Sequence, residues 1–223
     1  MNRILKKGGE RMCNCMNRGC SVSSNQLSVK CGNLCFSSGP LRATSTVCPP
    51  ENIGSIIPFS SGTGLVTVTF TPPELGEVRG VSAIGFGSAV DTIAIGNTVI
   101  LPTEVAGTTE AFSVPRVGTN TAISATFTET AIADVTGTAI ITAQVYRAPA
   151  GIITFTATNA FVNLTPVLTG TINVGTTFQG LANLSNIPVS AGDRLAMVFS
   201  VSGTGVTDII VLTGAATAGI TIS

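Results

Sequence analysis

The chain has 223 residues, of which 44% are hydrophobic and only 10% are charged, and its formal net charge is zero. Ordinary globular domains contain about 25% charged residues, so this chain can bury a large core but has little charge for its surface. It contains no histidine, which excludes Ser-His-Asp and Cys-His catalysis within the chain.

The first twelve residues, MNRILKKGGERM, are basic but have no apolar stretch, so they do not form a secretory signal. Residues 7–12 can be encoded by AAG-GGA-GGU-GAA-AGA-AUG, which places the ribosome-binding sequence GGAGGU just before a start codon. We therefore expect translation to begin at Met12, with residues 1–11 as a mis-annotated start. The alternative, that residues 1–11 are part of the protein, stays open.

The segment 12–55 is rich in cysteine and is expected to be an irregular N-terminal tail. Residues 1–48 contain seven Lys or Arg and one acid, Glu10, whereas residues 49–223 contain four Arg, no Lys and ten acids. The segment lacks clustered aromatic residues and its positive charge is thinly spread. A solvated, flexible tail is therefore favoured over a nucleic-acid-binding one.

The cysteines are the main chemical signal of the sequence, and they are candidates for disulfide cross-links: Cys13, Cys15, Cys20, Cys31, Cys35 and Cys48. Zinc sites usually use two cysteine pairs with two to four residues between the members. Cys31 and Cys35 fit that spacing, but Cys13 and Cys15 are too close. A polar tail with few apolar residues needs covalent ties, so disulfides, within or between chains, are favoured over metal.

Residues 36–55 are rich in Gly, Ser and Pro, which indicates a domain boundary. The residues that follow have the pattern of β-strands. The chain has 32 threonines, 30 of them after residue 55, and these together with many Val and Ile residues suit a pleated sheet. Apolar residues alternate with period two, which predicts four buried faces: Val66, Val68 and Phe70; Ile123, Ala125 and Phe127; Ala139, Ile141, Ala143 and Val145; Leu195, Met197, Phe199 and Val201.

Turn residues interrupt these runs at short intervals, and no segment has a sustained helical pattern. Roughly eight to ten short strands after residue 55 predict an all-β antiparallel sandwich or jelly roll. No run reaches the about 18 to 20 apolar residues of a transmembrane helix, so no membrane partner is expected.

The sequence offers no catalytic motif. A Gly-x-Ser-x-Gly, a P-loop and a dinucleotide fingerprint are all absent. Glu74 and Glu77 follow Pro72-Pro73 closely, but two acids in a turn are usually solvated charges rather than a catalytic pair. We therefore expect no enzyme activity, no catalytic or metal-binding residues and no cofactor.

The sequence after residue 56 resembles the C-terminal domain of BclB-type exosporium glycoproteins, over some three quarters of the chain. Six long motifs carry this resemblance: IIPFSSGTG (56–64), VSAIGFGSA (81–89), EAFSVPRVGTNTAISATFT (110–128), ITAQVYRA (141–148), VNLTPVLTGTINVG (162–175) and IPVSAGDRLAMVFSVS (187–202).

The resemblance implies a trimeric jelly roll similar to the tumour-necrosis-factor fold, displayed on bacterial spores, with no catalytic residues. The collagen-like stalk of that family is absent, and the cysteine-rich segment stands in its place. This layout is similar to that of endospore appendage subunits, in which an N-terminal connector links neighbouring subunits. The leading hypothesis is a self-assembling structural protein of the spore surface. The alternative is a spore-surface adhesin at a fibre tip.

Overall fold

The structure of the chain is a computed structural model. It describes residues 54–76, 79–102 and 109–223 in full, and the backbone of residues 13–15, 18–20, 28–31 and 34–37. Contacts between Cα atoms divide the chain into two units, Met1–Ile53 and Gly54–Ser223.

The described parts of the first unit are four short strands in two antiparallel pairs. Strand β1 (Cys13–Cys15) pairs with β2 (Arg18–Cys20), and β3 (Ser28–Cys31) pairs with β4 (Leu34–Ser37). Two residues separate the strands of each pair, and Gly32-Asn33 between β3 and β4 is typical of a tight hairpin turn. The segment expected to be irregular thus contains short strands where the structure describes it.

The second unit, called the domain below, contains thirteen strands and a short 3-10 helix in its described residues. In chain order these are β5 (Ser55–Ser60), β6 (Val66–Phe70), η1 (Pro73–Leu75), β7 (Arg79–Ile84), β8 (Ala89–Ala94), β9 (Thr98–Ile100), β10 (Phe112–Ser113), β11 (Gly118–Glu129), β12 (Ala133–Ala148), β13 (Thr154–Asn163), β14 (Leu168–Ile172), β15 (Thr177–Val189), β16 (Arg194–Thr204) and β17 (Ile210–Ile222). The sequence analysis predicted eight to ten strands, which is too few. Strands such as β9 and β10 are too short to show a period-two alternation of apolar residues in the sequence.

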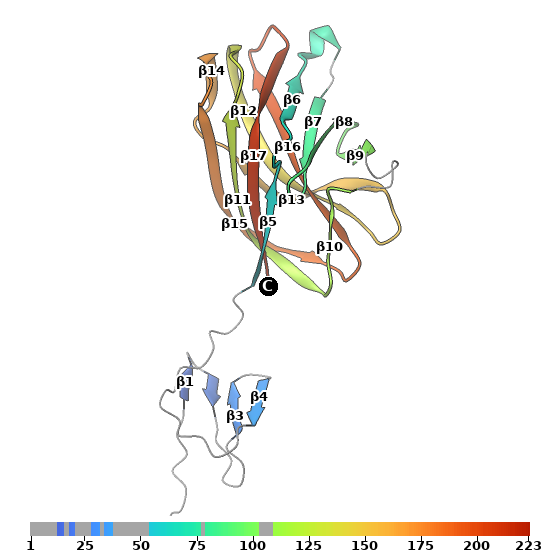
Figure 1. The fold of residues 1–223 in the computed structure, drawn as a ribbon, viewed down its shortest axis with the longest axis vertical. Coiled ribbons are helices and arrows are strands. Elements are labelled where there is room, and N and C mark those ends of the chain that lie inside the picture. Colours follow the sequence, from blue (N-terminus) through green and yellow to red (C-terminus); the bar gives the residue numbers. More distant parts are fainter. Residues whose placement is uncertain are drawn as a thin grey trace, which may run out of the picture. The chain divides into compact units, whose positions relative to one another are not determined.

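The strands of the domain form two layers (Figure 1). The first layer has the order β15-β11-β17, and β17 pairs with β5 along one half and with β6 along the other. The second layer has the order β8-β7-β16-β12-β13-β9, with β10 beside β16 and β14 beside β12. Because β6 pairs with both β17 and β7, the layers join along this side. The domain is an antiparallel jelly-roll sandwich, as the sequence predicted.

The main core lies between the two layers and confirms the four predicted faces. Every residue of those faces is buried, and they belong to one hydrophobic cluster. Across the layers, the rings of Phe127 in β11 and Phe199 in β16 lie 6.3 Å apart between centroids. Full burial of side chains of this size stabilises the fold by roughly 1.5–3 kcal/mol each.

A second, smaller core covers the other face of the second layer. Ala196 and Val198 alternate with the main-core residues of β16 and are buried on this opposite face, together with Tyr146 from β12 and Phe155 from β13. Strand β9 and the following Leu101 complete this cluster. The second layer is therefore buried on both faces here, which explains why β16 reads as a nearly continuous apolar run.

The sandwich is narrow where β15 of the first layer passes β13 of the second. A Cβ atom on Gly180 would lie 2.7 Å from Val162 Cγ2 and 2.8 Å from the Asn163 carbonyl oxygen. Only glycine fits that approach without movement of its neighbours. The backbone groups of Thr165 and Gln179 exchange two hydrogen bonds of 2.9 Å nearby, which ties the two layers together on this side.

Candidate functional site

In the strand pairings that the structure describes, two of the predicted cross-linking cysteines lie opposite each other. Cys13 in β1 and Cys20 in β2 are partners in the antiparallel register, whereas Cys31 and Cys35 face Leu34 and Lys30 respectively. Directly opposite Cα atoms lie about 4.5–5.5 Å apart in such a ladder, within the usual disulfide range of about 4.4–6.8 Å.

The remaining cysteines are not brought together by any described strand pairing. Cys15 is opposite Arg18 in the β1–β2 ladder. Cys48 lies outside the described residues, so its expected part in cross-linking stays a prediction. Whether disulfides or zinc engage these cysteines stays a prediction as well.

The two acids singled out in the sequence do not form a described pair. Glu74 lies in the 3-10 helix η1 and is exposed, and Glu77 lies outside the described residues. Among the residues that the structure describes, no group of three or more His, Cys, Asp or Glu side chains could hold a metal ion. Within the same residues, no helix is long and apolar enough to cross a bilayer.

The outward face of the first layer is the main feature that sequence reasoning missed. Register fixes its rows, since residues directly opposite in a ladder point to the same side of a sheet. We call it the uncharged face, and it consists of Thr177, Gln179, Leu181 and Asn183 of β15, Ala122, Ser124, Thr126 and Thr128 of β11, Ala215, Thr217, Gly219 and Thr221 of β17, and Ile56, Pro58 and Ser60 of β5.

The composition of the uncharged face is unusual for a surface. None of its residues is charged, and most are small. Its largest apolar side chains stand at its two edges, where Leu181 is 77% exposed and Ile56 is 73% exposed. A depression of about 410 Å³ lies beside Leu181, lined also by Ser124, Thr126 and Gln179. Small side chains and the absence of charge make this face suitable for close packing against another protein surface.

Glu129 is a buried acid at the end of β11, and its side chain points to the same side of the strand as the core residues Ile123, Ala125 and Phe127. Only 1% of this residue is exposed, and its Oε1 accepts hydrogen bonds from the backbone N–H groups of Thr213 at 3.0 Å and Ala131 at 3.4 Å. The other oxygen, Oε2, has no hydrogen-bond partner among the described residues. Burial raises the pKa of the Glu129 carboxyl above its ordinary value, and backbone hydrogen bonds oppose that rise only in part.

The raised pKa of Glu129 predicts that stability falls as pH rises. A group that binds its proton more tightly when folded stabilises the fold below its unfolded pKa of about 4.3, and this contribution is lost as pH rises through the folded pKa. We expect the melting temperature of Glu129→Gln, measured by circular dichroism, to fall less than that of the wild type between about pH 4 and pH 7.

A matched control for this experiment removes a carboxylate from the surface at the same end of the domain. Asp134 is exposed, and its Oδ1 accepts a hydrogen bond of 2.7 Å from Thr171 Oγ1. The variant Asp134→Asn is measured in parallel, so that the effect of removing a surface carboxylate can be subtracted from that of Glu129→Gln. Equal slopes for the wild type and Glu129→Gln would show that the buried carboxyl does not control this stability.

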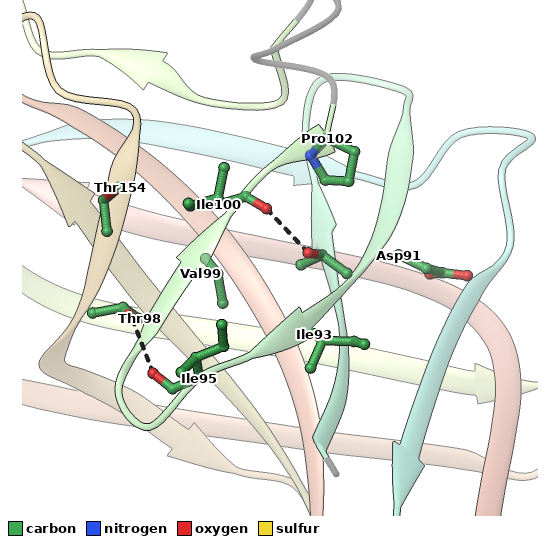
Figure 2. Close-up of a pocket in the computed structure, with 9 residues that line it drawn as sticks. Asp91, Ile93, Ile95, Thr98, Val99, Ile100, Pro102 and Thr154 are labelled. Carbon is green, nitrogen blue, oxygen red and sulfur yellow. Dashed lines mark hydrogen bonds between the residues drawn. The ribbon is translucent and has the colours of Figure 1, made fainter.

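An apolar hollow opens between β8 and β9, and we call it the β8–β9 cleft (Figure 2). Its volume is about 470 Å³. It is lined by Asp91, Thr92, Ile93, Ile95, Thr98, Val99, Ile100, Pro102 and Thr154. Its one charged lining residue, Asp91, accepts hydrogen bonds from the Ser82 hydroxyl and, at 3.1 Å, from the backbone N–H of Thr67.

The burial of Glu129 and the β8–β9 hairpin could both have been predicted from the sequence. Glu129 continues the period-two row of Ile123, Ala125 and Phe127, so its inward direction could have been read from the alternation. The segment 92–100, TIAIGNTVI, has branched apolar residues on both sides of Gly-Asn, which is typical of a hairpin. The uncharged face had no such signal, because its Thr, Ser and Ala residues resemble those of any solvated strand.

Comparison with known proteins gives no family and adds a structural likeness. No protein-family model and no curated protein matches the sequence. Among solved structures, the chain is similar to one described as "Structure of Eiger TNF from S. frugiperda", with 15% sequence identity and a TM-score of 0.32. The match covers 75% of this chain and 94% of that chain. The jelly-roll assignment itself rests on the strand pairing of the domain.

Proposed function

We propose that the protein is a self-assembling structural subunit of the bacterial spore surface, in an exosporium layer or an appendage fibre. The observation that carries the self-assembly is the uncharged face, a sheet surface without a single charged residue. A face without charges can pack against copies of the same chain without burying an unpaired charge, and closed symmetric assembly is the common way to cover such a face. The number of copies, three, and the spore surface follow from the resemblance to BclB-type exosporium domains.

The N-terminal segment supplies the second part of the proposal, the links between trimers. The domain itself contains no cysteine, so a disulfide cannot serve the jelly-roll core. Bonds between segments tether subunits that would otherwise separate, and thereby raise their effective concentration. Other spore-surface proteins are further partners to which the segment can anchor the assembly.

Negative-stain electron microscopy of the purified full-length protein tests this function. We expect fibres or sheets after oxidation, because links between trimers extend the assembly in at least one direction. Discrete trimers without further order would favour the alternative, an adhesive module tethered at a fibre tip. Monomers at micromolar concentration would contradict both forms of the proposal.

A further inference from the structure

Gly219 in β17 is the one glycine among the described residues that the single copy does not require. Each of the other described glycines either has a positive φ or would place an added Cβ atom no more than 3.2 Å from a neighbouring atom. The φ of Gly219 lies outside the positive region, and the nearest atom to its added Cβ, the Ile57 carbonyl oxygen, is 3.9 Å away. A larger side chain would therefore fit at this position without strain.

A glycine in the middle of a strand needs an explanation. It weakens the strand, because it has no side chain to pack and loses more conformational freedom on folding than other residues. Such a glycine often marks a position that a ligand or another chain approaches closely. Within the described domain nothing approaches Gly219 closely. The approaching group therefore belongs to another molecule.

Gly219 lies in the same cross-strand row as the most prominent side chain of the uncharged face. Leu181 of β15 is opposite Ser124 of β11. Ser124 is opposite Gly219, which is in turn opposite Pro58 of β5. Leu181 is 77% exposed, whereas the other three residues of the row are small. The row thus contains an apolar projection and an open position, two strands apart.

We infer that Leu181 of one copy packs over Gly219 of the next copy in a closed ring. This contact deepens the self-assembly proposed above and rests on it. The projection and the open position belong to the same chain, so a ring of identical copies buries every Leu181 and occupies every Gly219 position at once. The absence of charge around both positions lets the contact form without burying an unpaired charge.

A pair of engineered cysteines tests this contact. Leu181→Cys and Gly219→Cys are introduced into the full-length protein with its six native cysteines replaced by serine, so no other thiol is present. Within one chain, two strand spacings of about 4.8 Å place the two Cα atoms about 9–10 Å apart, beyond the about 6.8 Å that a disulfide spans. A bond between these two cysteines can therefore form only between copies.

Mild oxidation of the paired variant should give covalent dimers and trimers on a non-reducing gel. Either cysteine alone should give monomers. So should the control pair Leu181→Cys with Val174→Cys, because Val174 lies outside the uncharged face and is 61% exposed. Monomers from the paired variant would overturn the inference. Equal cross-linking by Leu181→Cys alone would place Leu181 against its own copy in the neighbour, and would overturn it too.

Filling the open position gives a second measurement, in which stability and association change in different directions. At concentrations where the protein is monomeric, Gly219→Val should leave the melting temperature unchanged or higher, because valine suits a strand and the space is open. Under reductant, it should raise the concentration needed for association at least about tenfold in sedimentation experiments, because Leu181 of the next copy loses its place. A lower melting temperature would show that the single copy does require this glycine, against the inference.

Removing the projection should have a matching effect. Leu181→Ser should weaken association by a factor similar to that of Gly219→Val. In the double variant the two losses should not multiply, because both changes remove the same contact. Losses that multiply would assign the two residues to separate contacts, which the inference excludes.

The outcomes separate this contact from the function on which it rests. If microscopy shows ordered assemblies but the cysteine pair stays monomeric on the gel, the structural function stands and the contact between Leu181 and Gly219 is wrong. If the full-length protein neither assembles nor cross-links between copies, both are wrong.

Discussion

Reduction should convert the oxidised assembly into separate trimers. We expect the full-length assembly to resist heat and detergent until a thiol reductant is added, and the variant with all six cysteines replaced by serine never to acquire that resistance. Disulfides between N-terminal segments would hold neighbouring trimers together after non-covalent contacts have melted. The measurement is non-reducing gel electrophoresis after heating, combined with light scattering with and without reductant.

Two controls distinguish which cysteines link subunits and through which chemistry. The pair Cys13 and Cys20 is opposite in the β1–β2 ladder and is expected to close within one chain, where such a bond typically contributes about 2–4 kcal/mol. Replacing both with serine should therefore leave the links between trimers in place. A chelator under oxidising conditions should also have no effect. Dissociation by the chelator, with resistance to the reductant, would favour zinc and refute the disulfide links.

A single charge on the uncharged face should separate the trimer into monomers. Ser124 lies in β11, between β15 and β17, and is exposed in the single chain. In the variant Ser124→Glu, packing of this face would bury a carboxylate without a partner, at a cost of roughly 3 kcal/mol per copy. Because all three copies bear this cost, we expect the concentration needed for trimer formation to rise on the order of 1000-fold, as measured by sedimentation velocity.

The matched control introduces the same charge elsewhere on the domain. Val174 lies in the turn between β14 and β15 and is 61% exposed, outside the uncharged face. Val174→Glu should form trimers as the wild type does. If Ser124→Glu remains trimeric, or if the wild type is a monomer at micromolar concentration, this face is not the assembly surface.

The sequence predicted the main core better than the surfaces. Alternation in segments such as 121–129 identifies the buried face directly, because one side of each strand meets the other layer and the opposite side does not. In β16, alternation identified the face in the main core but did not reveal that Ala196 and Val198 on the opposite face are buried in the second core. That core depends on β9 and Leu101 covering the second layer, a contact that period-two alternation within β16 cannot reveal.

The candidate interfaces were harder to predict for a different reason. The uncharged face is assembled from β15, β11, β17 and β5, which are distant in sequence and adjacent only through the order of the sheet. Likewise, Cys13 and Cys15 are closest in sequence, but the hairpin register places Cys13 opposite Cys20. Which residues share a face or a ladder follows from strand order and register, and local residue patterns determine neither.

The pairing of β5 with β17 decides where foreign sequence could be attached to this protein. Ser55 is opposite Ile222, so the chain enters and leaves the domain side by side. A cargo fused after Ser223 would emerge where the cysteine-rich segment joins the domain, and would crowd it. The turn around Gly205, between β16 and β17, lies at the other end of β17 and is exposed. Insertion there would present the cargo outward, so this turn is the better position for antigens or enzymes displayed on a particle surface.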